Sequence, residues 1–519
     1  MTGASSAQLV ARLAAVEARV REAVARRRAR DAGPDDRFRG LYISEAQVDE
    51  LLADRAARAP GGPKLTRAGP AVGSGSGTGT TRLERLASAF GLDDVDLDLV
   101  LVAMAPDLDP RFERLYGYLH DDVTRRRAST GLALELCGLG LASVERRRLG
   151  DSGPLCRGGV LVVGEADRPF PTRSLRVPDR VALHLLGDAT PEPSLEGLVM
   201  TTAPLASPVA EALARALGAG VRLAFLRERS GTSGHATAVA AFAAGGWPAV
   251  ALDLRRLPAG ADAAAVATTA VREARLLGAG LVAGPVEGLA ERDVAALRVM
   301  ADATWPVVLV GGRSWDPAWS SDVPLLLEAP APTPAQRAAL WQAALAGAGA
   351  EDAEAARSTT HFTLAPDQVW RAAVTARLRA EAEGRPLGAD DLGHGALAQN
   401  GAGLERLARR IEPEVGWDDL VLPAPVLEQL RELTVRARLG DTVFGAWAMG
   451  RGRRGHRSLT ALFAGPSGVG KTMAAEVVAS DLGLDMYCID LATVVDKYIG
   501  ETEKNLDRIF TEAERVNGV

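Results

Sequence analysis

The chain has 519 residues, 47% of them hydrophobic and 24% charged, which is enough for three or four domains with aliphatic cores. A formal net charge of −6 gives no general basis for nucleic-acid binding, and three widely spaced cysteines argue against a disulfide framework or a zinc site. The sequence has neither an apolar run of 18 residues nor a signal-peptide pattern, which predicts a soluble, cytoplasmic protein without a membrane partner.

The first 60 residues are expected to be a helical segment. Residues 6–30 repeat apolar side chains at helical spacing, with arginines on the other face. The basic end at 26–28 is interpreted as solvated, and docking to a partner helix is the alternative. Ser44 and Gln47 form a capping box for a short second helix. Residues 61–80, rich in Gly, Pro, Ser and Thr, predict a flexible linker.

Residues 81–190 predict a compact helical or winged-helix-like domain. A helix over 96–104 is expected to end at Pro106, because proline interrupts helices. Arginine triplets at 125–127 and 146–148 fall at helix ends or turns, where cations are favourable. Winged-helix folds bind DNA in other settings, but a solvated or protein-facing role is preferred here and nucleic acid is an unlikely partner.

Residues 191–330 alternate between strand and helix patterns, which predicts an α/β domain. After a strand over 221–226, residues 229–236 occupy the place of a phosphate-binding loop. Compared with the pattern G-x-x-x-x-G-K-[ST], this segment has Arg229 for the first glycine, His235 for the lysine and Ala236 for the hydroxyl. His235 is interpreted as structural, because the sequence shows no carboxylate partner for it. A helical region follows over 331–412, ending with a helix over 404–411.

The complete phosphate-loop pattern lies in the last domain, residues 413–519. A buried strand is expected over 458–464 and a helix opening over 473–479, which is the context that the pattern requires. Only four of the 60 basic residues are lysines, so a lysine at this position is a specific signal. Lys471 would contact the β- and γ-phosphates of ATP, and Thr472 would bind Mg²⁺. The predicted cofactor-binding residues are Gly465, Pro466, Ser467, Gly468, Val469, Gly470, Lys471, Thr472 and Met473.

Two flanking segments resemble the AAA-type ATPases. Residues 417–420 resemble the segment that leads into the adenine pocket, and residues 497–499 resemble the pore loop that grips a threaded polypeptide. The resemblance covers residues 416–519 and implies an α/β fold of the P-loop NTPase type. An ordinary half-buried aromatic is the alternative for the tyrosine of the second segment. The residues implied are Asp418, Asp419 and Leu420 near the nucleotide, and Lys497, Tyr498 and Ile499 against a protein substrate.

The α/β region at 191–330 resembles an AAA module that has kept its fold and lost its chemistry. Gly284 and Pro285 stand where the family has Asp and Glu, and residues 334–341 open a segment that resembles the helical lid. An unrelated α/β domain is the alternative. The tandem plan resembles the AAA ATPases of bacterial contractile injection systems, on segments 37–43, 108–116 and 411–423. Such proteins form homo-oligomeric, hexameric rings that remodel or assemble protein partners at the cost of ATP.

In that family a further strand ending in Asp-Glu completes Mg²⁺ binding and activates water. The sequence is expected to be truncated before this strand, so no catalytic residue is predicted within the chain. The hydrophobic run that ends at Asp490 is followed by Leu491 and lacks the catalytic glutamate. Three hypotheses remain: a ring ATPase acting on protein, a nucleotide-binding regulator or hydrolysis-dead fragment, and a P-loop enzyme of another class that uses Asp490.

Overall fold

The computed structural model divides into two compact units. The first comprises residues 1–199, 247–307 and 316–323, and the second comprises 200–246, 308–315 and 324–519. The short helix expected after Ser44 and the linker expected at 61–80 lie almost wholly outside the described residues. The structure describes residues 3–30, 48–49, 53, 80–229, 231–346, 359, 362, 364–399, 408–441, 443, 459–489, 506, 509–510, 513 and 518–519.

The N-terminal part of the first unit is helical, as the sequence predicts. Helix α1 carries the expected apolar stripe, and the stripe is buried with α4, α5 and α6. Val16 and Val20 are 1% and 0% exposed, so the stripe is part of the core of this unit. The helices are α1 (Gly3–Arg30), α3 (Arg82–Phe90), α4 (Asp94–Leu108), α5 (Arg111–His120), α6 (Thr130–Leu136), α7 (Pro154–Arg157) and α8 (Asp179–Leu186), with 3-10 turns at Val144–Leu149, Phe170–Thr172 and Pro193–Leu195.

Helix α4 continues through Pro106, so the prediction that it ends there is wrong. Because proline has no backbone N–H, the carbonyl of Val102 one turn earlier loses its helical hydrogen bond. The hydroxyl of buried Tyr116 on α5 donates a hydrogen bond to this carbonyl at 2.9 Å. The helix therefore tolerates Pro106 in its last turn and ends at Leu108.

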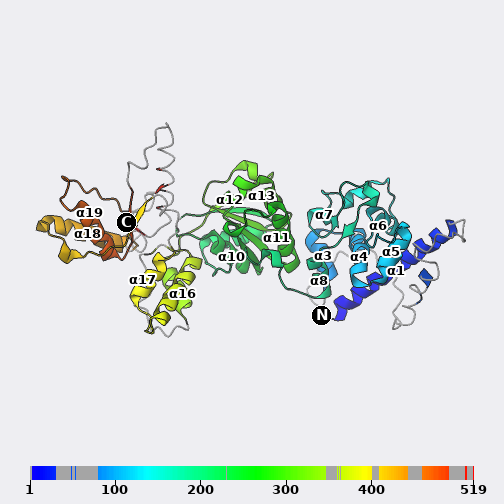
Figure 1. Cartoon of the computed structure of the whole chain (residues 1–519), viewed down its shortest axis with the longest axis horizontal. Coiled ribbons are helices and arrows are strands. Elements are labelled where there is room, and N and C mark those ends of the chain that lie inside the picture. The colour runs from blue at the N-terminus through cyan, green and yellow to red at the C-terminus, as the bar shows by residue number, and fades with distance from the viewer. Residues whose placement is uncertain are drawn as a thin grey trace. The chain divides into compact units, whose positions relative to one another are not determined.

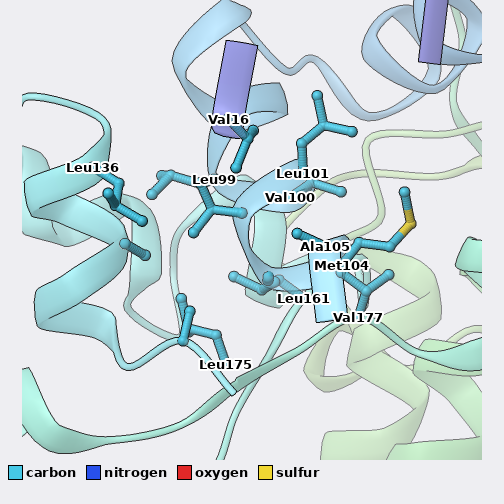
Figure 2. Close-up of a cluster of buried hydrophobic side chains, with 14 of the residues drawn as sticks. Val16, Leu99, Val100, Leu101, Met104, Ala105, Leu136, Leu161, Leu175 and Val177 are labelled. Carbon is cyan, nitrogen blue, oxygen red and sulfur yellow. The ribbon is translucent and has the colours of Figure 1, made fainter. Parts of the chain in front are cut away.

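The core of the first unit joins these helices to a short antiparallel hairpin formed by β1 (Val162–Val163) and β2 (Leu175–Arg176). Complete burial of one aliphatic side chain stabilises a fold by about 1.5–3 kcal/mol. A core shared by α1, α4, α6 and the hairpin therefore holds the N-terminal helix to the helices that follow it. Figure 2 labels Val16, Leu99, Val100, Leu101, Met104, Ala105, Leu136, Leu161, Leu175 and Val177 of this cluster.

A five-stranded sheet confirms the expected α/β region, with strand order β4-β5-β6-β3-β7. Strand β4 is parallel to β5, and β3 is parallel to β7. Every residue of β5 and β6 is buried, as is typical of parallel strands with both faces covered. The strands are β3 (Leu223–Arg227), β4 (Ala249–Asp253), β5 (Gly280–Gly284), β6 (Val307–Gly311) and β7 (Leu325–Glu328), and the helices are α9 (Pro208–Gly218), α10 (Gly234–Ala244), α11 (Ala263–Leu277), α12 (Glu287–Arg292) and α13 (Val294–Ala301).

The later part of the second unit begins with helices. Helix α14 (Pro334–Leu345) starts at the expected position behind a capping box formed by Thr333 and Gln336. Helices α16 (Pro366–Ala382) and α17 (Ala389–Leu397) pack side by side and share a core with α14 (Figure 1).

The prediction of a helix over 404–411 is wrong for residues 408–411, the part of this segment that the structure describes. Residues Arg409–Ile411 form strand β8, antiparallel to β9 (Met486–Cys488). Arg410 donates to the buried carboxylate of Asp485 at 2.9 Å. A strand of three residues depends on this distant partner, which local spacing does not reveal.

The described residues include no helix that is both long enough and apolar enough to cross a bilayer.

Candidate functional site

The predicted phosphate loop leads directly into helix α19 (Lys471–Leu482), which confirms the helix expected over 473–479. Gly468 and Gly470 have φ angles of 83° and 84°, where any side chain would be strained. The first N–H groups of a helix have no partner within the helix and favour anions. The two glycines therefore turn an exposed loop into the amide-rich start of α19.

Lys471 folds back over this loop. Its Nζ donates hydrogen bonds to the carbonyl oxygens of Pro466 at 2.6 Å and Gly465 at 3.0 Å. Thr472, the next residue of α19, is exposed. Backbone amides, one ammonium group and one accessible hydroxyl are the groups that the pattern uses for phosphates and Mg²⁺. The residues present therefore fit a magnesium nucleotide.

A small apolar core connects α19 to the tryptophan–acidic segment. Leu420 is 6% exposed and packs in this core, next to helix α18 (Ala424–Asp441). The structure thus brings the predicted residue Leu420 together with the helix that carries Lys471. The core consists of Leu420, Leu430, Ala474, Val477 and Val478, bordered among others by Trp417, Phe463 and Met473.

Asp418 and Asp419 lie in a 3-10 turn, Trp417–Asp419, and both are exposed. The carboxylate of Asp419 accepts a hydrogen bond from the backbone N–H of Gly416 at 2.8 Å. The guanidinium of Arg431 lies 5.6 Å from the centre of the Trp417 ring. In this structure Asp419 closes its own turn, and Leu420 provides the packing against α19.

The buried strand expected before the loop is not formed in the part that the structure describes. Residues 459–464 have no regular secondary structure. Leu462 is 92% exposed and Leu459 is 45% exposed. A strand requires hydrogen-bonded neighbours, and the described strands nearest in sequence, β8 and β9, pair with each other. The segment has the apolar residues expected of a strand, but the prediction that it is buried is wrong for the described residues.

Several predicted residues lie outside the described part of the chain: the pore-loop residues Lys497, Tyr498 and Ile499, and the alternative metal ligand Asp490. Within the described residues, no group of three or more His, Cys, Asp or Glu side chains is placed to hold a metal ion.

A cavity of about 420 Å³ in the second unit lies apart from the phosphate loop. Its lining includes Arg379, Asp391, Arg410 and Tyr487, from α16, α17, β8 and β9. Arg379 lies 3.8 Å from the Asp391 carboxylate, and Arg410 is paired with Asp485. The cavity contains none of the predicted nucleotide-binding residues, so it is not the candidate site.

The loop at residues 229–236 of the first α/β region also leads into a helix, but its residues differ from the phosphate-loop pattern. Helix α10 begins at Gly234 behind Ser233, whose hydroxyl caps the helix. A Cβ atom on Gly234 would lie 2.7 Å from a methyl carbon of Val310, so this glycine is required for packing the helix start against the sheet. His235 and Ala236 are 6% and 0% exposed. Buried side chains at these positions offer neither an exposed ammonium group nor a hydroxyl.

Sequence reasoning missed Glu228, which immediately precedes this loop. Its carboxylate accepts a hydrogen bond from the backbone N–H of Gly234 at 2.6 Å, and Nδ1 of His235 lies 3.7 Å from the same oxygen. His235 therefore has a carboxylate neighbour that the sequence did not reveal. The available signal was an acidic residue directly before a phosphate-loop pattern that lacks its lysine.

The arginine-rich turns of the first unit are largely neutralised within the unit. Arg127 pairs with Asp107 at 2.8 Å, and Arg148 pairs with Asp93 at 2.7 Å and with Asp96 at 2.9 Å. DNA recognition relies on arginines that can reach phosphates and base edges. These pairs engage the guanidinium groups of Arg127 and Arg148 within the unit, which argues against their use in DNA binding.

Two parts of the chain, one near each end, match known protein families. Residues 7–199 match the family described as "Winged helix domain, variant", a match that includes α1. Residues 461–519 match the AAA family, described as "ATPase family associated with various cellular activities". The chain thus combines an N-terminal segment that matches a winged helix domain, a central α/β sheet and a C-terminal segment that matches the AAA ATPase family.

Individual relatives match over short segments. An uncharacterized AAA family ATPase, y4kL, of Sinorhizobium fredii is 34% identical over 106 residues, which is 20% of this chain and 30% of that protein. Cell division protein C of Sulfolobus acidocaldarius is 31% identical over 130 residues, 25% of this chain and 32% of that protein. The peroxisomal ATPase PEX6 of Dictyostelium discoideum is 34% identical over 101 residues, 20% of this chain and 8% of that protein. The matched segments thus cover about a third or less of each relative.

Proposed function

We propose that this protein binds Mg-ATP at residues 465–473 and couples its hydrolysis to the remodelling or assembly of protein partners. The observation that carries the proposal is the arrangement of Lys471 and Thr472 at the start of α19, behind a loop with two positive-φ glycines. The match of residues 461–519 to the AAA family supports it.

Different residues of the chain would contact different parts of the bound Mg-ATP. The amides of the glycine loop would hold the phosphates, and Lys471 would exchange its carbonyl contacts with Gly465 and Pro466 for the β- and γ-phosphates. Thr472 would supply one oxygen ligand to Mg²⁺, which neutralises charge on the phosphates during transfer. Leu420 and the core beneath it would keep the tryptophan–acidic segment, with Asp418 and Asp419, beside the nucleotide.

The proposed action on protein partners is supported by the ATPases that this chain resembles. PEX6 is named a peroxisomal ATPase, and y4kL an AAA family ATPase. We propose a homo-oligomeric, hexameric ring that acts on a protein substrate in the cytoplasm, with Tyr498 of the pore loop as the gripping side chain. Service to a bacterial contractile injection system is the most specific form of this proposal, supported by the sequence segments at 37–43, 108–116 and 411–423.

Nucleotide binding can be tested by titrating the protein with a fluorescent ATP analogue in the presence of Mg²⁺. Lys471→Ala removes a charge-assisted contact of about 1.5–3 kcal/mol, so affinity is expected to fall about 10- to 100-fold. The matched control is Lys64→Ala, the same substitution in the sequence predicted to be a linker, which should leave affinity unchanged. Wild-type affinity in Lys471→Ala would refute the assignment of the site.

The alternatives predict different outcomes. A nucleotide-binding regulator would show Lys471-dependent binding without release of phosphate. A P-loop enzyme of another class would transfer the phosphate to a small molecule, and Asp490→Asn would abolish that transfer. Protein-stimulated ATP hydrolysis that is lost in both Lys471→Ala and Tyr498→Ala would favour the ring ATPase acting on protein.

A further inference from the structure

The loop of the first α/β region contains a carboxylate where a phosphate-binding loop binds its ligand. Glu228 directly follows β3, and its backbone N–H donates to the carbonyl of Gly311 at 2.7 Å. This bond fixes the main chain of Glu228 beside β6. The side chain, 25% exposed, turns towards the start of α10.

The contact at the start of α10 is short and charge-assisted. The N–H of Gly234, the first residue of the helix, donates to Oε1 of Glu228 at 2.6 Å. Charge-assisted hydrogen bonds are shorter and about twice as strong as neutral ones. The helix dipole adds attraction for a negative charge at this end. A carboxylate thus fills the position that attracts an anion at a helix start.

Other described groups of the loop also find partners within the chain. The Ser233 hydroxyl accepts from the N–H of Ala236 at 3.1 Å. The Thr232 hydroxyl accepts from the N–H of Arg229 at 2.8 Å and donates to the Arg229 carbonyl at 2.9 Å. The N–H groups of Gly234 and Ala236 at the helix start therefore obtain from Glu228 and Ser233 the kind of hydrogen bond that a phosphate loop directs to its ligand, and Thr232 closes the turn before them.

We propose that Glu228 is an internal substitute for a nucleotide phosphate, which keeps the first module's loop closed and folded without nucleotide. This module would then hold one conformation while the module at residues 413–519 binds and releases ATP. The inference concerns residues 228–236 alone and is independent of the function proposed for Lys471.

The test is hydrogen exchange of the full chain, read by mass spectrometry on peptides that cover residues 228–240. In the wild type, millimolar inorganic pyrophosphate should leave exchange in this segment unchanged, because the carboxylate already occupies the position. In Glu228→Ala, exchange should rise about tenfold or more, and pyrophosphate should restore most of the protection. Sodium chloride at matched ionic strength should not restore it.

Two further variants separate this proposal from loss of an ordinary contact. Glu228→Gln keeps the shape and one acceptor, and should exchange at a rate between wild type and Glu228→Ala. Glu328→Ala is the matched control, because Glu328 forms an exposed pair with Arg229 of the same loop at 3.2 Å, and it should not change exchange.

Three outcomes would overturn the proposal. Protection of the wild-type loop by pyrophosphate would show an open anion site. Unchanged exchange in Glu228→Ala would show that the carboxylate does not hold the loop. Faster exchange in Glu228→Ala without rescue by pyrophosphate would reduce Glu228 to a structural helix cap.

Discussion

Removing either partner of the ion pair between Arg180 and Glu273 should destabilise the first unit strongly. Arg180 lies on α8, within the winged helix match, and Glu273 lies on α11, beyond it. The guanidinium binds the carboxylate through both Nε, at 2.9 and 3.2 Å, and Nη2, at 2.9 Å. The side chains are only 4% and 2% exposed, so solvent cannot replace a lost partner.

The magnitude follows from this burial. Loss of one member leaves an uncompensated buried charge, which costs about 3–5 kcal/mol. For a unit of this size, about 2–4 °C is lost per kcal/mol, so Glu273→Leu should lower the melting temperature by about 6–20 °C. Replacing both residues, as Arg180→Met with Glu273→Leu, removes both charges and should cost less than the single substitution.

Differential scanning calorimetry of the full chain measures this effect. The matched control is Glu22→Ala, which removes a solvent-exposed partner of Arg26 in the same unit and should change stability by no more than about 1 kcal/mol. A melting temperature for Glu273→Leu within about 2 °C of wild type would refute the reasoning. So would a double variant that is less stable than Glu273→Leu.

Titration and thiol chemistry provide two more tests. Burial, reinforced by nearby arginines, lowers the pKa of His184 to about 4, whereas in the unfolded chain it titrates near pH 6.5. The stability that this group contributes is therefore complete above about pH 6.5 and falls by up to about 3 kcal/mol towards pH 4. Urea unfolding should show that the free energy of unfolding differs less between pH 7 and pH 4.5 in His184→Gln than in the wild type. Burial raises the pKa of Cys137 to about 12 and of Cys156 to about 11, while Cys488 is exposed. Iodoacetamide at pH 8 should therefore label Cys488 at least about tenfold faster, and equal labelling of all three in peptide mass spectra would contradict this.

Features that depend on neighbouring residues in the sequence were predictable. The helix after Gly470 follows from a glycine turn before a run of helix formers, and the stripe on α1 follows from helical spacing. The sheet at 223–328 follows from its alternating pattern. In each case the local preference and the tertiary structure agree.

Features that depend on distant partners were not predictable. Pro106 stays helical because a tyrosine ten residues later satisfies the carbonyl of Val102. Residues 409–411 form a strand because they meet β9, more than 70 residues away in sequence. The segment at 459–464 has the apolar residues of a strand but is largely exposed. Composition and spacing show which segments are able to form strands. Whether a segment forms one depends on a partner strand that is distant in the sequence.

The helix starts of α10 and α19 differ in the side chains that they carry. Gly234 is held by packing, since a side chain there would clash with Val310, and this constraint does not depend on any ligand. The residues at the lysine and hydroxyl positions of the pattern are His235 and Ala236, which are also buried. A helix start attracts negative charge, and at α10 Glu228 supplies it from one residue outside the pattern. At α19 the ammonium group of Lys471 contacts the loop carbonyls of Gly465 and Pro466, and we propose that it exchanges them for a stronger anionic partner. Under these two proposals, the source of the negative charge, the chain itself at α10 or a bound nucleotide at α19, is what separates the two loops.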